Sequence, residues 1–169
     1  MLSHAPALLA GVALVLVLGA AMHDVATRTV PNWFSAGIAA AGLLMRLCAG
    51  DLMFGLIFAS VVFAGATLLW WLRLMGGADA KLFGATALAV SPVGIPGLLI
   101  FTALAGGVLA LAYLISSRMV RRPAPGRRRT LLGRIAKAEL WRLSRRGPLP
   151  YATAIAAGSA VTLSPQLWG

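Results

Sequence analysis

The sequence predicts an all-α, polytopic membrane protein: a six-transmembrane-helix bundle with a basic cytoplasmic loop before the last helix. The 169-residue chain is 60% hydrophobic and only 11% charged, and its mean hydropathy is +0.88. Soluble domains carry about 25% charged and about 45–50% apolar residues. Because most of the chain lies in apolar runs, no room remains for a separate soluble domain. Residues 1–169 are therefore predicted to form a single transmembrane domain.

Six apolar runs are predicted to span the bilayer, which takes about 20 residues of helix. The run 82–117 is too long for one helix, and the Pro- and Gly-rich segment 91–97 divides it into a short span and a full one. The last run has about 15 residues and reaches a usable length only if it continues toward Trp168. The first three runs cover residues 6–22, 33–49 and 52–72, and the last run covers residues 149–163.

The uneven distribution of cations predicts the orientation of the bundle. With six spans, the polar segments 24–32, 73–81 and 118–147 share one side of the membrane. They hold fourteen of the fifteen Lys and Arg residues, against Arg46 alone on the other side. The side rich in Lys and Arg faces the cytoplasm, so both termini are predicted to lie outside. Arg46 is expected to extend its side chain to the opposite headgroups.

The basic segment 118–147 is expected to bind anionic lipid headgroups, and no nucleic acid partner is predicted, because topology already explains a basic loop beside transmembrane helices. Within it, apolar residues near helical spacing over 130–146 favour an interfacial helix. A role in guiding or covering a substrate is the alternative for this helix.

The small number of cysteines and the lack of cations before the first apolar run limit the possible functions further. The lone cysteine, Cys48, excludes an intrachain disulfide and a cysteine-based zinc cluster. No metal or cofactor is predicted. No Lys or Arg precedes the first apolar run, so this run is expected to be retained rather than cleaved as a signal peptide.

The acidic residues are few: Asp24, Asp51, Asp79 and Glu139. Asp24 ends the first span and Asp79 begins the fourth, so both are predicted at the cytoplasmic end of the bundle, with Asp51 at the opposite end. Two neighbouring carboxylates suit aspartyl proteolysis, in which one activates water as a base and the other polarises the scissile carbonyl. At ~4 Å and an effective dielectric constant of ~20 they repel by about 4 kcal/mol, which predicts one shared proton. The alternative is two helix-capping carboxylates at a membrane interface.

Three motifs resemble those of the type IV prepilin peptidases. Asp24, followed by Arg28 and Val30-Pro31-Asn32, is similar to that family's aspartate and Ile-Pro-Asn pattern. The segment Gly76-Gly77-Ala78-Asp79-Ala80-Lys81-Leu82 resembles its Gly-x-Gly-Asp-x-Lys-Leu signature. Leu149-Pro150-Tyr151 resembles the Pro-Tyr start of its last helix. The order of the motifs and the number of spans match over essentially the whole chain.

The resemblance implies a six-helix bundle in the bacterial cytoplasmic (inner) membrane. It also implies cleavage of the leader from prepilins and pseudopilins, on the amino-terminal side of their hydrophobic segment. Larger members of the family carry paired Cys-x-x-Cys motifs in a methylating region, which this chain lacks. It is therefore similar to the short, protease-only form of tight-adherence (Flp-type) pilus systems, and no methyltransferase activity is expected.

By motif position, Asp24 and Asp79 are implied to be the catalytic pair. The residues implied to bind substrate or shape the site are Gly76, Gly77, Ala78, Lys81, Pro31 and Asn32. Ala78 stands where the pattern has its second glycine. If that position requires a positive φ, or a close approach to the substrate, alanine costs on the order of 1 kcal/mol; alternatively, Gly77 makes the turn.

Several roles remain open from the sequence alone. Asn32 either binds backbone near the site or only shapes the turn at Pro31. Lys81 either lowers the pKa of the Asp79 carboxyl or anchors to headgroups, and His23 either orients a proton or is simply solvated. The competing function is non-enzymatic: a small membrane transport or pilus-assembly subunit that uses Asp24 and Asp79 for ions or packing.

Overall fold

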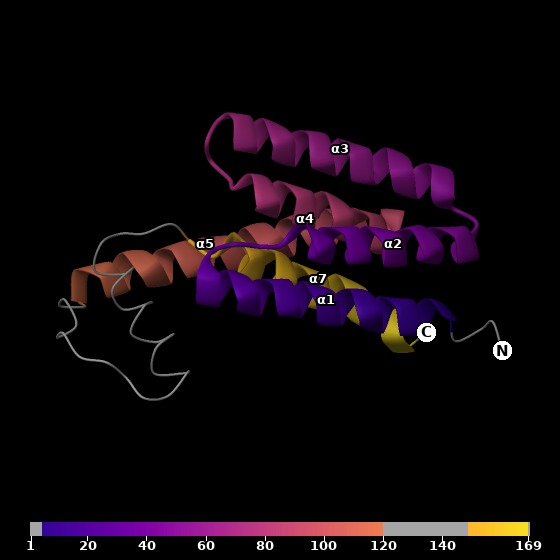
Figure 1. Ribbon diagram of the computed structural model, residues 1–169, viewed down its shortest axis with the longest axis horizontal. Coiled ribbons are helices and arrows are strands. Elements are labelled where there is room, and N and C mark those ends of the chain that lie inside the picture. The colour runs from indigo at the N-terminus through magenta and orange to yellow at the C-terminus, as the bar shows by residue number, and fades with distance from the viewer. Residues whose placement is uncertain (1–4, 120–148, 169) are drawn as a thin grey trace.

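The computed structural model describes residues 5–119 and 149–168, which form helices joined by short connections, with no strand among them (Figure 1). The predicted all-α class is confirmed. The predicted interfacial helix over 130–146, and the basic loop beyond Met119, lie outside the described residues. The elements are α1 (Ala5–Thr27), α2 (Asn32–Ala49), α3 (Leu52–Trp71), α4 (Gly77–Ala89), the 3-10 turn η2 (Pro92–Gly94), α5 (Ile95–Met119) and α7 (Tyr151–Trp168).

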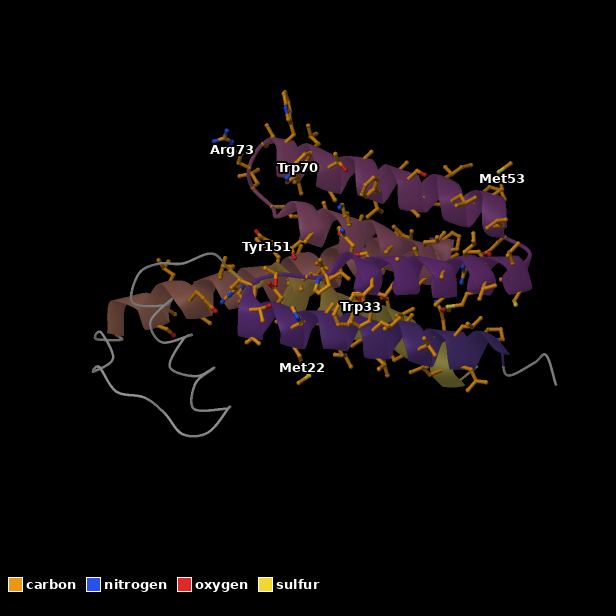
Figure 2. All side chains as sticks on the ribbon, in the orientation of Figure 1. Met22, Trp33, Met53, Trp70, Arg73 and Tyr151 are labelled. Atoms are coloured by element: carbon orange, nitrogen blue, oxygen red, sulfur yellow. The ribbon has the colours of Figure 1, made fainter. Side chains whose placement is uncertain are left out.

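Four of these helices are long and apolar enough to cross a membrane: Pro6–Thr27, Asn32–Ala49, Leu52–Trp71 and Pro92–Ser116. Large apolar side chains cover the outside of α3 and α5, and Figure 2 shows Met22 and Met53 pointing away from the bundle. An apolar outer surface of this extent is expected of helices that face lipid. The chain is therefore a multi-pass membrane protein with helices as the regular elements of its described part, and the count of six spans stays a prediction.

The helix α4 is the buried centre of the bundle. It has 13 residues, so at 1.5 Å per residue it covers about 20 Å, less than the ~30 Å hydrocarbon core. Apart from Lys81, every residue from Ala80 to Val90 is buried. It packs between α2 and α3, while α7 packs against α1 and α5 (Figure 1). A helix that is apolar on all sides is expected to be buried in this way.

Glycine allows the closest of these helix contacts. A Cβ on Gly42 would lie 2.7 Å from the backbone nitrogen of Ala89, so the backbones of α2 and α4 touch where a side chain would separate them. The sequence predicts such packing for Gly37, Gly42, Gly65, Gly106 and Gly107, with entry of a partner helix as the alternative. Close packing is confirmed for Gly42 and is absent at Gly65 and Gly107, which have nothing within 4 Å of a built Cβ.

Arg46 does not extend to headgroups as predicted. Its side chain is buried, and its Nη1 forms an ion pair of 2.7 Å with Oδ2 of Asp51. The side chain lies against Gly55, where a Cβ would come within 2.7 Å of it. Arg46 is buried because Asp51, at the α2–α3 turn, offers it a charge partner that a headgroup would otherwise supply.

Two helices extend beyond the apolar runs from which they are predicted. The apolar run ends at Met22, but α1 continues to Thr27, because the backbone N–H of Arg28 still donates to the Asp24 carbonyl at 2.7 Å. Asp24 therefore lies on the last turn of a helix rather than in a loop. At the other end of the chain, α7 continues past Leu163 to Trp168, as the short last run requires.

Candidate active site

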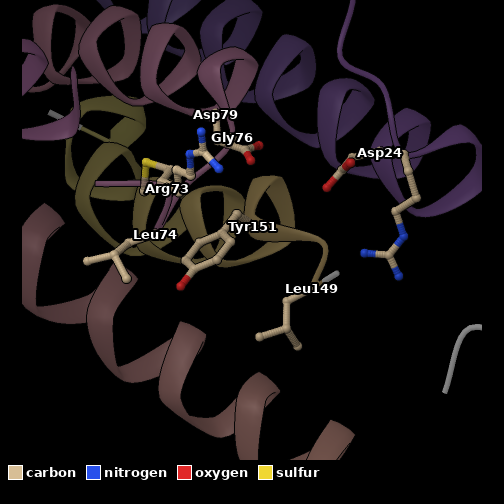
Figure 3. A pocket seen from close by; sticks show the side chains of 9 residues that line it. Asp24, Arg73, Leu74, Gly76, Asp79, Leu149 and Tyr151 are labelled. Carbon is tan, nitrogen blue, oxygen red and sulfur yellow. The ribbon is translucent and has the colours of Figure 1, made fainter. Parts of the chain in front are cut away.

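A pocket of about 400 Å³ opens at the end of the bundle where α1 ends, α4 begins and α7 begins. Asp24 and Asp79 both line it, and Figure 3 shows their carboxylates turned toward each other from opposite walls. Within residues 5–119 and 149–168, no three His, Cys, Asp or Glu side chains lie close enough to share a metal ion. The lining residues are Asp24, Arg28, Arg73, Leu74, Met75, Gly76, Asp79, Leu149 and Tyr151.

Asp24 is fixed by the last turn of α1 and by the connection that follows it. Its side chain is only 7% exposed. Nδ1 of His23 lies 2.6 Å from the carbonyl oxygen of Thr29, and the Thr27 hydroxyl donates to the His23 carbonyl at 2.8 Å. These contacts close the chain back on the helix end. This ring nitrogen of His23 therefore holds the α1–α2 connection, which is a different role from orienting a proton at Asp24.

Asp79 occupies the first turn of α4, and its carboxylate folds back over Gly76. A Cβ on Gly76 would lie 2.7 Å from Oδ2 of Asp79, and the Gly76 backbone N–H donates a hydrogen bond to this carboxylate. Asp79 is the third residue of α4 and Gly76 is the N-cap residue, so the bond from the Gly76 N–H corresponds only to the return bond of a capping box. Capping and chemistry are compatible here, because the same carboxylate also faces the pocket.

The pKa of Asp79 is raised to about 6, first by burial of the carboxyl and second by the negative charge of Asp24. The Arg28 charge and the Gly76 hydrogen bond act in the opposite direction and lower the pKa. Asp79 lies outside the four helices able to cross a membrane. A carboxyl with this pKa keeps its proton at a pH at which an ordinary aspartate is ionised.

The glycine motif provides space rather than an unusual backbone conformation. Gly76 has an extended backbone, with φ −71° and ψ 143°. Ala78 is the second residue of α4 and packs against the core. Among the described residues, the only positive φ values belong to Arg28, Gly50 and Arg73. The predicted strain at Ala78 is therefore wrong, and Gly77 makes no left-handed turn in its place.

The leader cleavage that the resemblance implies is expected to stay within about twofold of wild type in the variant Ala78→Gly, which should lose about 0.5–1 kcal/mol of stability. Glycine relieves no strain at a helical position, and it only adds freedom to the unfolded chain. A leader-cleavage assay and thermal unfolding in detergent check the two parts. A gain in activity of tenfold or so would contradict the helical assignment and would support the cost that the sequence pattern predicts for alanine at this position.

Lys81, Asn32 and Pro31 lie beside the pocket without lining it. Nζ of Lys81 donates to Oδ1 of Asn32 at 3.3 Å, and both side chains are exposed. Pro31 immediately precedes α2 and is its N-cap residue. These residues therefore join the start of α2 to the first turn of α4, next to Asp79.

Sequence reasoning missed most of the pocket wall. Arg28 and Tyr151 belong to two of the motifs described for the sequence, and their place in these motifs could have identified them as pocket residues. Arg73 carries no such signal. Its backbone has φ 60°, and the connection between α3 and α4 brings it to the pocket. Leu149 belongs to the same motif as Tyr151, whereas Leu74 and Met75 supply apolar surface that no local pattern distinguishes from the neighbouring spans.

Comparison with known proteins gives one match. The family model described as the type IV leader peptidase family matches residues 11–111, more than half of the chain, and the matched range contains both Asp24 and Asp79. No curated protein matches the chain, and no solved structure does. The chain therefore belongs to the type IV leader peptidase family, a family of proteases whose substrates are of the prepilin type.

Proposed function

We propose that this protein is an aspartic-type leader peptidase of Flp-type prepilins and pseudopilins. In this proposal it cleaves at the cytoplasmic face of the inner membrane, with Asp24 and Asp79 as the water-activating pair. The observation that carries the proposal is that both carboxylates, from helices far apart in sequence, line one pocket. The family match supports leader cleavage as the reaction.

The chemistry requires one ionised and one protonated carboxyl. The ionised group takes a proton from water as the oxygen attacks the scissile carbonyl, and the protonated group donates to the carbonyl oxygen. When the tetrahedral intermediate collapses, the C–N bond breaks and the leaving amine takes the proton from the carboxyl that acted as base. The other carboxylate takes a proton back from a hydroxyl of the intermediate, which restores the starting state of the pair. The raised pKa of Asp79 supports this division, because Asp79 holds the proton while Asp24 acts as the base.

The pocket wall supports a substrate in which a polar leader meets a hydrophobic helix. Leu74, Met75 and Leu149 give the wall apolar surface, and Arg28 and Arg73 give it positive charge. A peptide that changes from polar to apolar at the scissile bond matches a wall of this mixed character. Cytoplasmic placement of the pocket follows from the predicted orientation, in which the Arg- and Lys-rich side faces the cytoplasm.

The proposal is tested by co-expressing the protein with an Flp-type prepilin and following loss of the leader as a gel shift. The mass of the product amino terminus reports methylation in the same sample. We expect a shortened prepilin with an unmethylated amine. If several Flp-type prepilins stay uncleaved while another leader peptidase processes them in the same cells, the proposed substrate class is wrong.

The kcat/KM for cleavage is expected to fall as the pH rises through about 6, the pKa of Asp79. Below this value the pair keeps one proton. Above it, both carboxyls ionise and no group remains to donate to the carbonyl oxygen. The kcat/KM profile reports groups of the free enzyme, so it is the profile to measure, from about pH 5 to about pH 8. A rate that rises steadily over this range would contradict the assigned proton.

A further inference from the structure

We propose that Tyr113 of α5 fixes Arg28 beside the Asp24–Asp79 pocket, and that Arg28 is a positioning residue that sets the charge state of the two carboxylates. This inference rests on the function proposed above, because it assumes that the two carboxylates act as a pair. It assigns a role to two residues that do not themselves carry out the chemistry.

Arg28 is held at two points. Its Nη2 donates a hydrogen bond of 2.6 Å to the Tyr113 hydroxyl, and its Cζ lies 5.8 Å from the centroid of the Tyr113 ring. That distance is within the range of a cation–π contact. Its backbone N–H donates to the Asp24 carbonyl at 2.7 Å. Since Arg28 also lines the pocket, these contacts fix a positive charge at a defined place next to the carboxylates.

The backbone of Arg28 is in an unfavourable conformation for this residue type. Its φ is 57°, in the left-handed region that commonly follows a helix and is usually occupied by glycine. Among the non-glycine residues of the described chain, only Arg28 and Arg73 have a positive φ, and both line the pocket. Strained residues of this kind concentrate at functional sites, where the surrounding contacts hold them. Glycine would close α1 with less strain, so we infer that the arginine side chain is what this position requires.

The charge of Arg28 opposes the other influences on Asp79. Burial and the Asp24 charge both favour the protonated form of Asp79, whereas Arg28 favours the ionised form. Fixing Arg28 therefore limits the pH up to which the pair keeps its proton. The ionisable side chains that line the pocket with Asp79 are Asp24, Arg28, Arg73 and Tyr151, and Lys81 lies on α4 itself.

The test measures kcat/KM against pH for the full-length protein in membranes, using a co-purified Flp-type prepilin. Its variants are Arg28→Gln, Arg28→Lys and Tyr113→Phe. Thr67→Val is the matched control, because it removes one hydroxyl from the exposed side of α3, where Thr67 bonds only the Phe63 carbonyl. The alkaline limb is expected to move up by about one pH unit in Arg28→Gln. Tyr113→Phe should move it less in the same direction, and Arg28→Lys and the control should keep it in place.

Two results would overturn the inference. In the first, Arg28→Gln loses activity equally at every pH without moving the limb, which is the behaviour of a purely structural residue. In the second, the kcat/KM profile of Tyr113→Phe is the same as that of wild type, or the alkaline limb of Arg28→Lys moves as far as that of Arg28→Gln. Failure of the proposed function is distinguishable, because Asp79→Asn would then cleave as wild type does, and the role of Arg28 would be rejected together with it.

Discussion

Replacement of either Asp24 or Asp79 by asparagine is expected to reduce leader cleavage by about 10²–10⁴-fold, the usual contribution of a general acid or base. Asparagine keeps the size of the side chain but neither takes a proton from water nor donates one to the carbonyl. Both side chains line the same pocket, so the two variants should lose activity to a similar extent. A double variant should lose little more, because residues that act as a unit are not additive.

Asp51→Asn is the matched control for these variants. Asp51 is the remaining aspartate of the chain and lies at the α2–α3 turn, paired with Arg46 and absent from the pocket wall. Cleavage per folded molecule should stay at the wild-type level, although loss of the ion pair is expected to lower stability. Cleavage that survives in Asp24→Asn and Asp79→Asn would refute the proposed mechanism. It would favour the competing view, in which these aspartates serve ion binding or packing.

The pairing of Asp24 with Asp79 was predictable because topology alone constrains it. Antiparallel spans return the end of the first helix and the start of the fourth to the same side, and a residue at the α2–α3 turn must then lie on the other. The structure brings Asp24 and Asp79 to one pocket and separates Asp51 from them. Such a prediction needs only the order and number of apolar runs, which composition and length strongly determine.

Contacts between side chains of different helices were not predictable in the same way. Arg46 appears from the sequence to end near headgroups, yet it is buried against Gly55 and paired with Asp51. The link from Arg28 to Tyr113 joins residues that no local pattern connects. These contacts depend on the rotation of each helix about its axis, and apolar runs with little amphipathic character do not specify that rotation.

The glycine motif illustrates the same limit at the level of one residue. A glycine before an aspartate suggests a turn with a positive φ, and on that basis alanine at position 78 appears costly. In the structure Gly76 is extended and Ala78 is helical. What Gly76 provides is space, and only the folded position of the Asp79 carboxylate shows which atom uses it.

Gly76→Ala is accordingly expected to reduce cleavage by about 10²-fold, the loss that follows from moving a catalytic group by about 1 Å. The new Cβ would lie 2.7 Å from Oδ2 of Asp79, so the carboxylate must move. The extended backbone at this position, with φ −71°, accepts alanine without strain, and the N–H that bonds Asp79 is retained. The variant should therefore fold normally and lose activity for a steric reason alone.

Gly77→Ala is the neighbouring control. A Cβ there would meet Nε1 of Trp70 at 3.0 Å, the edge of a side chain that is half exposed and free to shift, so cleavage should fall only a few-fold. The comparison is made by the gel shift of a co-expressed prepilin, with the amount of folded protein measured in parallel. Equal activity of Gly76→Ala and wild type would mean that the carboxylate position over Gly76 is not the one used in the reaction. If both glycine variants lose activity equally, the glycines are needed for the fold of the α3–α4 connection and not for the position of the Asp79 carboxylate.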